Sequence, residues 1–270
     1  MLHESIYLDP TDDRVYIDTY VANDKSRRRD AMLVIPGGGY SNVCTEREGE
    51  PIALAFLARG LNAFVLNYRV GRGDRYPSQL IDASRAIVYI KDNSERFNID
   101  PGRVFTLGFS AGGHLSGSCA VLHKDPEVLT ALGIEQGRNK PRASVLCYPV
   151  VTAMMPTHQG SFERLTGMPY GDIPEQLRRK YSLEERLDSD SAPMFIWHTA
   201  TDAVVPCDGS LMLARRAASL GIPVQLRLYP YGPHGLALSN ALTECNNAAF
   251  SQPIAAEWVD KAVEWLATIA

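Results

Sequence analysis

Cysteine is scarce in this sequence, and the patterns that cysteine usually serves are missing. The 270 residues hold five cysteines, an odd number, and no two of them form a C-x-x-C pair. A disulfide framework or a zinc site would need paired spacings, so neither is indicated. We expect five reduced thiols, at Cys44, Cys119, Cys147, Cys207 and Cys245.

Long apolar runs and clustered positive charge are also missing. No stretch approaches the roughly 18 apolar residues of a membrane-spanning helix, and the opening MLHESIYLDPTDD has polar groups where a secretion signal needs an apolar core. Lysine and arginine number 27 against 31 acidic residues, and the basic run at 27–29 ends at Asp30. We therefore expect no nucleic-acid partner and no membrane partner. The composition predicts a cytoplasmic protein, although a secreted form without its signal would look the same.

What the sequence has instead is an alternation of short apolar segments and longer amphipathic ones. The apolar, β-branched segments predict strands over 14–21, 31–36, 62–68, 103–109, 143–149, 193–199 and 224–230. The later segments are almost continuously hydrophobic, which is typical of parallel strands covered on both faces. The first segment alternates apolar and polar residues, which favours an antiparallel strand at the edge of the sheet.

Helical patterns lie between most of these segments. They cover about 47–59, 78–96, 111–123, 208–220 and 253–268. Strands that alternate with helices predict an α/β fold, with a mostly parallel sheet and helices on both faces. We expect a single domain over 1–270 with a small insertion at about 152–192; a crossover helix with a long loop is the alternative for that segment.

The stretch LGFSAGGH, residues 107–114, contains the pattern Gly-x-Ser-x-Gly around Ser110. About 0.1 chance matches are expected in a chain of this composition, so the pattern alone is a modest signal. Its surroundings strengthen it, because a strand pattern precedes it and a helix pattern follows it. A strand, a sharp turn and a helix form a nucleophile elbow, in which Gly108 and Gly112 avoid a collision. We therefore predict that Ser110 is a catalytic nucleophile in a strained backbone conformation.

A serine hydroxyl needs a base to take its proton and an acid to orient that base. In this architecture the acid and then the base follow the serine, each in a loop after a strand. The loop in WHTATDAVVP offers Asp202, and the loop in YPYGPHGLAL offers His234. These residues are the predicted acid and base of the triad. Asp208 is the nearest rival acid, but its position after Pro206 favours a helix N-cap.

A glycine run, LVIPGGGYSN, follows the predicted strand at 31–36. Negative charge on a tetrahedral intermediate is usually held by two or three fixed backbone N–H groups. The amides of Gly38 and Gly39, with that of Ala111 at the start of the next helix, are the predicted oxyanion hole. Neither G-x-G-x-x-G nor G-x-x-x-x-G-K-[ST] fits this run. We expect no cofactor and no metal.

Histidines other than His234 are assigned other roles. His198 falls within a predicted strand and is expected to be packed and hydrogen-bonded. His114 is expected to support the helix of the elbow, and His3 and His123 are expected at the surface.

Two further side chains are predicted to contact the substrate. Tyr40 ends the glycine run, and His158 lies in the insertion, which we expect over the active-site end of the sheet. A charged stretch, Arg47-Glu48-Gly49-Glu50, follows the glycine run. We interpret it as charge compensation at a helix N-terminus.

From about residue 14 to its end, the chain resembles the α/β-hydrolase superfamily, in particular the acetyl esterase and carbohydrate (xylan) esterase branch near the hormone-sensitive lipase group. The resemblance rests on PGGGY, GFSAGGH, WHTATDAVVP and YPYGPHGLAL in this order. It implies an α/β-hydrolase fold and the same triad and oxyanion residues. One departure is Pro36, which stands where members close to hormone-sensitive lipase have histidine. Another is the lack of a large N-terminal cap.

The resemblance implies a serine esterase for short-chain carboxylic esters, acetyl esters of sugars or xylan fragments foremost. Its partner would be a small-molecule ester, such as an acetylated oligosaccharide. An amidase, a formamidase or a small peptidase with the same triad is the first alternative, because ester and amide cleavage use the same groups. A non-catalytic ligand-binding protein on this scaffold is the second. The sequence does not indicate an oligomeric state.

Overall fold

An eight-stranded sheet forms the centre of the protein, in a computed structural model that describes residues 1–71 and 73–269. The strands are β1 (Ser5–Tyr7), β2 (Tyr16–Tyr20), β3 (Arg29–Ile35), β4 (Asn62–Asn67), β5 (Ile99–Phe109), β6 (Ser144–Cys147), β7 (Met194–Thr199) and β8 (Val224–Tyr229). Their order across the sheet is β1-β2-β4-β3-β5-β6-β7-β8, antiparallel from β1 to β4 and parallel from β4 to β8. The predicted mostly parallel sheet with an antiparallel N-terminal part is confirmed.

The edge of the sheet differs from the prediction by one strand. The alternating segment forms β2, which pairs with β4 in the expected antiparallel sense, but β1 pairs outside it and is the edge strand. β1 has three residues, too few to show the period of two by which a strand is predicted.

Eleven helices and two 3₁₀ turns accompany the sheet in the described part of the chain. They are α1 (Thr45–Glu48), α2 (Glu50–Leu57), α3 (Ser78–Asp92), α4 (Ser94–Phe97), α5 (Ser110–Val121), α6 (Pro126–Leu132), α7 (Gln159–Thr166), η1 (Tyr170–Asp172), α8 (Glu175–Tyr181), α9 (Leu183–Arg186), α10 (Asp208–Ser219), η2 (Ala248–Phe250) and α11 (Trp258–Thr268). The helix predicted over 47–59 is interrupted at Gly49, where a side-chain Cβ would lie 2.5 Å from the Thr45 carbonyl oxygen.

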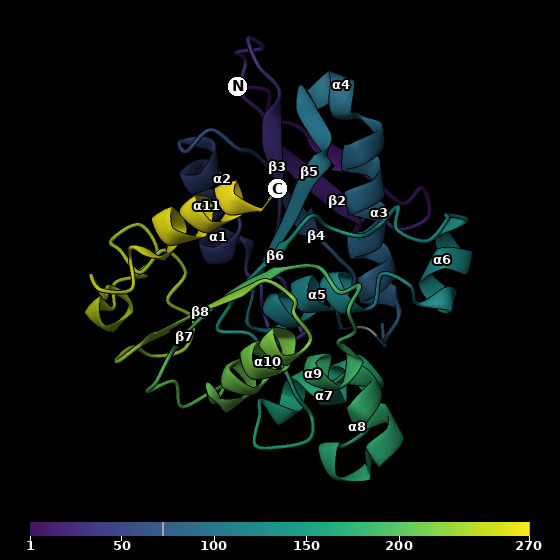
Figure 1. Ribbon diagram of the computed structural model, residues 1–270, viewed down its shortest axis with the longest axis vertical. Coiled ribbons are helices and arrows are strands. Elements are labelled where there is room, and N and C mark those ends of the chain that lie inside the picture. The colour runs from purple at the N-terminus through teal and green to yellow at the C-terminus, as the bar shows by residue number, and fades with distance from the viewer. Residues whose placement is uncertain (72, 270) are drawn as a thin grey trace.

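Helices cover both faces of the sheet, as predicted (Figure 1). On one face Ile87 of α3, Leu115 of α5 and Leu213 of α10 share one buried apolar cluster. On the other face, α2 packs against Trp258 of α11, and the Trp258 ring stacks on Trp197 of β7 at 5.4 Å between centroids. Burial of apolar surface on both faces is the main stabilising contribution to this three-layer arrangement.

The segment 152–192 contains α7, η1, α8 and α9, which gather at the lower end of the molecule in Figure 1. Its C-terminal part is fixed to the sheet core, because α9 packs against α5 and α10. In addition, the Leu183 amide donates to the Val151 carbonyl at 3.0 Å, and the Ala153 amide donates to the Ser182 hydroxyl at 2.9 Å. This segment brings His158 to the start of α7.

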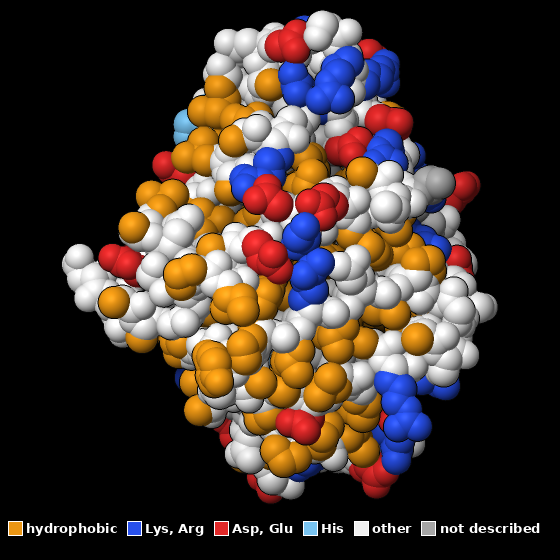
Figure 2. Space-filling view, turned by 60° about the vertical axis from the view of Figure 1, so that its left-hand side comes forward, with side chains coloured by type: hydrophobic (Ala, Val, Ile, Leu, Met, Phe, Trp, Pro, Cys, Tyr) orange, Lys and Arg blue, Asp and Glu red, His pale blue; other side chains and the backbone are white. Residues whose placement is uncertain are grey.

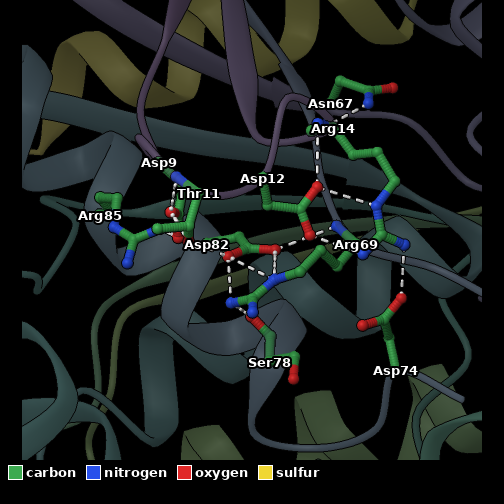
Figure 3. A network of polar contacts seen from close by, with 10 residues as sticks. All are labelled: Asp9, Thr11, Asp12, Arg14, Asn67, Arg69, Asp74, Ser78, Asp82 and Arg85. Carbon is green, nitrogen blue, oxygen red and sulfur yellow. Dashed lines mark hydrogen bonds and ion pairs between the residues drawn. The ribbon is translucent and has the colours of Figure 1, made fainter.

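An ion-pair network ties the loop between β1 and β2 to α3 and to the segment after β4 (Figure 3). Asp9 pairs with Arg85 of α3 at 2.6 Å, and Arg14 pairs with Asp74 at 2.6 Å. The antiparallel N-terminal part is thereby held to the parallel part by charged contacts as well as by strand pairing.

Figure 2 turns forward the side of the molecule that carries α11 and β8. Apolar side chains lie over much of the middle and lower part of this face, and Lys and Arg side chains gather toward its upper end. The exposed large apolar residues include Leu228, Tyr231, Leu242 and Ile254. Within the residues described, no helix is both long and apolar enough to cross a bilayer.

Candidate active site

Ser110 stands at a sharp turn between β5 and α5. Its φ is 53°, in the left-handed region that residues with a side chain seldom adopt. The turn is possible because of its two glycines: a Cβ on Gly108 would lie 2.0 Å from the Gly112 carbonyl oxygen, and a Cβ on Gly112 would lie 2.2 Å from that of Ile35. The predicted elbow geometry is present.

His234 and Asp202 lie in line with Ser110. The His234 Nε2 atom is 2.8 Å from the Ser110 Oγ atom, and Nδ1 is 2.7 Å from Asp202 Oδ2. A neutral imidazole with its proton on Nδ1 donates to the carboxylate and leaves Nε2 to accept the serine proton. The structure thus brings together the three residues predicted as nucleophile, base and acid, from the loops after β5, β8 and β7.

Asp202 is held as a carboxylate by its surroundings. Its Oδ1 atom accepts the amides of Val204 and Val205, each at 2.9 Å, and His198 Nε2 lies 3.3 Å from Oδ2. Burial acts to raise the pKa of Asp202, but hydrogen bonds from His198 and His234 outweigh it and hold that pKa well below its usual range. The group therefore stays charged and able to orient His234 at neutral pH.

The loops that carry Asp202 and His234 are joined through Gly232. The Thr199 hydroxyl donates to the Gly232 carbonyl at 2.8 Å, and the Gly232 amide donates to the Thr201 hydroxyl at 3.0 Å. The loops that carry Asp202 and His234 are therefore joined by hydrogen bonds between threonine hydroxyls and the Gly232 backbone.

The glycine run adopts a conformation that favours glycine. Gly38 and Gly39 have φ values of 126° and 62°, and a Cβ on Gly38 would lie 2.2 Å from the Asn42 carbonyl oxygen. Gly37 lies beside the serine, since its own Cβ would be 3.1 Å from that of Ser110. Its amide donates to Glu48 Oε2 at 2.8 Å.

A cavity of about 390 Å³ opens onto Ser110 and His234. Its wall includes Gly38 and Gly39 of the glycine run and His158 of the 152–192 segment. The other lining residues are Ser41, Asn42, Cys44, Arg47, Glu48, Val204, Gly235 and Phe250. A cavity of this size accepts a small acyl group together with part of a larger molecule.

Of the two predicted substrate contacts, only His158 lines this cavity. Its Nδ1 is 2.9 Å from the Ser161 hydroxyl oxygen, and burial, followed by the nearby charge of His234, lowers its pKa. The prediction for Tyr40 is wrong: the side chain is 2% exposed, and its hydroxyl lies 2.8 Å from His114 Nδ1 in the core. The backbone turns at Tyr40 with a φ of 58°, which directs the ring inward.

The other histidines are buried except for His3. His198 and His114 are packed and hydrogen-bonded as expected, His198 to the Ser210 hydroxyl and His114 to the Tyr181 carbonyl. His123 was expected at the surface, but it is 1% exposed, so that prediction is wrong.

The predicted N-cap at Asp208 is also displaced, because Asp208 is the first residue of α10 and Cys207 precedes it as the cap. The carboxylate thus lies in the first turn of the helix, where negative charge is still favourable. Asp208 is not among the residues that line the cavity.

Two residues beside the triad escaped prediction. Tyr148 follows β6, and its ring lies 5.0 Å from that of His234 between centroids, at 72°. Its place at the carboxyl end of a predicted parallel strand was a usable signal, because such ends face the site. Glu48 was interpreted as charge compensation at a helix N-terminus, yet its side chain is buried and forms part of the cavity wall.

A family model described as BD-FAE matches residues 17–216, which is well over half of the sequence. The chain belongs to the BD-FAE family. The matched segment includes the glycine run, Ser110 and Asp202, and it ends before His234.

This BD-FAE protein is similar to two curated proteins along most of its own length. It is 39% identical over 229 residues to endo-1,4-beta-xylanase B of Butyrivibrio fibrisolvens, covering 82% of this chain and 34% of that one. It is 29% identical over 208 residues to an acetylxylan esterase of Xylanibacter ruminicola, covering 76% and 40%. The BD-FAE chain therefore spans between a third and two fifths of the length of these relatives.

Among solved structures, the acetyl ester-xyloside bifunctional hydrolase of Caldicellulosiruptor lactoaceticus is similar over the whole chain. The TM-score is 0.82 at 31% identity, covering 98% of the BD-FAE chain and 96% of that protein. The α/β-hydrolase fold and the resemblance to the acetyl and carbohydrate esterase branch are confirmed.

Proposed function

We propose that the protein is a serine esterase that hydrolyses short-chain carboxylic esters, acetyl esters of sugars or xylan fragments foremost. The observation that carries the proposal is the hydrogen-bonded series from Ser110 through His234 to Asp202, open to a cavity walled by Gly38 and Gly39. A serine hydroxyl in contact with an oriented base is the arrangement that nucleophilic acyl transfer requires.

In the proposed reaction, the Ser110 oxygen attacks the ester carbonyl carbon while its proton passes to His234 Nε2. The carbonyl oxygen becomes an oxyanion, which the amides of Gly38, Gly39 and Ala111 stabilise. The bond to the alcohol oxygen then breaks, and the alcohol leaves with the proton from His234. Water repeats the sequence on the acyl-enzyme, which releases the acid and restores Ser110.

The hydrogen bonding of the backbone amides around Ser110 supports this assignment of the oxyanion hole. Gly37 donates its amide to Glu48. Among the described groups, the amides of Gly38, Gly39 and Ala111 have no acceptor within hydrogen-bonding range. These three N–H groups are therefore the ones that an incoming oxyanion could use without breaking an existing bond.

The choice of acetyl esters rests on the small cavity and on the names of relatives. The acetylxylan esterase of X. ruminicola and the acetyl ester-xyloside hydrolase of C. lactoaceticus both bear acetyl substrates in their names. We also propose that residues 1–270 act as one domain, because the 152–192 segment supplies His158 to the cavity.

Turnover of p-nitrophenyl acetate, butyrate and octanoate by the wild type and by Ser110→Ala tests the proposal. We expect the wild-type rate to fall with chain length, and kcat for acetate to fall at least about 10³-fold in the variant, because within the described residues Ser110 is the hydroxyl in contact with His234 Nε2. Ser118→Ala is the matched control on α5, since its hydroxyl donates to the His114 carbonyl at 2.8 Å and should leave kcat unchanged. Wild-type turnover in Ser110→Ala would contradict the mechanism.

A substrate panel then separates the alternatives. Acetylated xylo-oligosaccharides, formyl-kynurenine and aminoacyl anilides represent the esterase, formamidase and peptidase activities. We expect the highest kcat/KM on the acetylated sugars. A higher kcat/KM on either amide would replace the esterase assignment while leaving the roles of Ser110 and His234 in place.

A further inference from the structure

Glu48 is a buried carboxylate that the proposed reaction does not use. It ends the short helix α1, its side chain is 6% exposed, and it forms part of the cavity wall beside Ser110. Both carboxylate oxygens are engaged: Oε2 accepts the Gly37 amide and Oε1 accepts the Tyr148 hydroxyl, each at 2.8 Å.

The two partners of Glu48 belong to two different parts of the site. Gly37 immediately precedes Gly38 and Gly39, the residues proposed for the oxyanion hole. Tyr148 is linked to the segment that carries the base, because its hydroxyl accepts the Ala237 amide at 3.0 Å and its ring packs against His234. One carboxylate thus connects the glycine run to the loop that carries the base.

A carboxylate in this position is costly for the folded state. No salt bridge to Glu48 forms among the described residues. The guanidinium of the neighbouring Arg47 instead donates to the carbonyls of Gly235, at 2.5 Å, and Thr243, at 3.1 Å. Burial raises the pKa of Glu48, opposed by the hydrogen bonds from Tyr148 and Gly37. Unpaired buried charge of this kind opposes folding, and it is more common at functional sites than elsewhere.

We propose that Glu48 is a positioning residue that sets the oxyanion loop and the His234 loop in register around Ser110. It acts through the Gly37 amide on one side and through the Tyr148 hydroxyl on the other, and it does not itself contact the reacting atoms. This proposal rests on the proposed esterase function.

Steady-state kinetics with p-nitrophenyl acetate test it in Glu48→Ala, Glu48→Gln and Tyr148→Phe. We expect Glu48→Ala to lower kcat by about 10- to 100-fold with KM within about threefold, because small displacements of catalytic groups affect the transition state most. Glu48→Gln keeps an acceptor for Gly37 and a polar group toward Tyr148, so kcat should recover to within about fivefold of wild type. Tyr148→Phe keeps the ring on His234 and should lose about tenfold.

The double variant and stability measurements separate positioning from folding. If Glu48 and Tyr148 act through one connection, Glu48→Ala/Tyr148→Phe should lose no more than about threefold beyond Glu48→Ala. Thermal unfolding should place Glu48→Gln at or above the wild-type Tm, because it removes a buried charge. Glu46→Ala is the matched control, since Glu46 is exposed on the same helix and should leave kcat unchanged.

The outcomes that overturn the proposal are distinct from failure of the esterase function. Wild-type kcat in both Glu48→Ala and Tyr148→Phe overturns it, as does a loss in Glu48→Ala that Glu48→Gln does not recover. Should Glu48→Ala fail to fold, Tyr148→Phe decides. Labelling of Ser110 by a fluorophosphonate probe tests the nucleophile separately: absence of labelling in the wild type, with full turnover in Ser110→Ala, would reject the esterase function itself.

Discussion

Gly112 is the residue on which the position of Ser110 depends most directly. A Cβ at this position would lie 2.2 Å from the carbonyl oxygen of Ile35, the last residue of β3, and 2.4 Å from that of Pro36, which follows it. These are backbone atoms at and directly after a strand end, so neither can move aside without shifting the main chain. The close approach of α5 to β3 therefore requires glycine, and it sets the distance between the serine and the glycine run.

We expect Gly112→Ala to lower the free energy of unfolding by about 3 kcal/mol, because the added methyl group must push α5 away from β3. Urea denaturation measures the change. Gly171→Ala is the control, because no atom lies within 4 Å of a Cβ built there, and it should leave the midpoint unchanged. A stable Gly112→Ala protein with a wild-type midpoint would show that the elbow can shift without strain.

At single residues, the sequence predicted which loop carries a side chain but not how that side chain is oriented or buried. Ser110, Asp202 and His234 could be placed because their loops follow predicted strands, and the carboxyl ends of parallel strands meet at one edge. Tyr40 could be assigned to the right loop but not to an orientation, because its φ of 58° turns the side chain into the core. Glu48 was missed for a different reason, because its burial depends on tertiary contacts with Gly37 and with Tyr148, which is 100 residues away in sequence.

At the scale of elements, the long apolar segments were predictable and the short ones were not. The strands of the parallel sheet are buried on both faces, so their sequences are continuously apolar and easy to recognise. β1 and the seven-residue helix α6 are too short to display a period. The interruption at Gly49 depends on tertiary contact, because a Cβ there would also lie 3.0 Å from Val65 of β4.

Asp82 of α3 binds the segment after β4 to that helix, and it is the most buried acid of the network in Figure 3. Its carboxylate accepts the Arg69 backbone amide at 3.0 Å and the Arg69 guanidinium at 2.6 Å. Burial raises the pKa of Asp82 even though the hydrogen bonds from Arg69 oppose this shift.

We expect Asp82→Ala to lower the free energy of unfolding by about 3 kcal/mol, because it leaves the Arg69 amide and guanidinium without their acceptor. Urea unfolding, followed by tryptophan fluorescence, measures the change. Glu264→Ala removes an exposed partner of Lys261 on α11 and should cause no measurable loss. Equal midpoints for the two variants would mean that the network contributes nothing to stability beyond strand pairing.

At the scale of the whole molecule, acidification should lower the free energy of unfolding, because one histidine is buried in its neutral form. His114 lies between the Tyr40 hydroxyl and the Tyr181 carbonyl, and burial lowers its pKa from 6.5 to about 4. Between these two values the unfolded chain binds a proton that the folded chain does not. The free energy of unfolding therefore decreases as the pH falls through this window.

We expect this single group to remove about 2 kcal/mol of stability between pH 7 and pH 5, from the linkage between pKa and unfolding. Urea unfolding at both pH values, for the wild type and for His114→Gln, isolates the contribution of His114 from those of the buried carboxylates, which titrate in both proteins. The loss from pH 7 to pH 5 should be smaller in His114→Gln by about that amount, whatever its stability at pH 7. His3→Gln alters an exposed histidine and should keep the wild-type difference. If His114→Gln loses as much stability as the wild type between the two pH values, His114 must accept its proton within the folded protein, and the interior around Tyr40 must admit the charge.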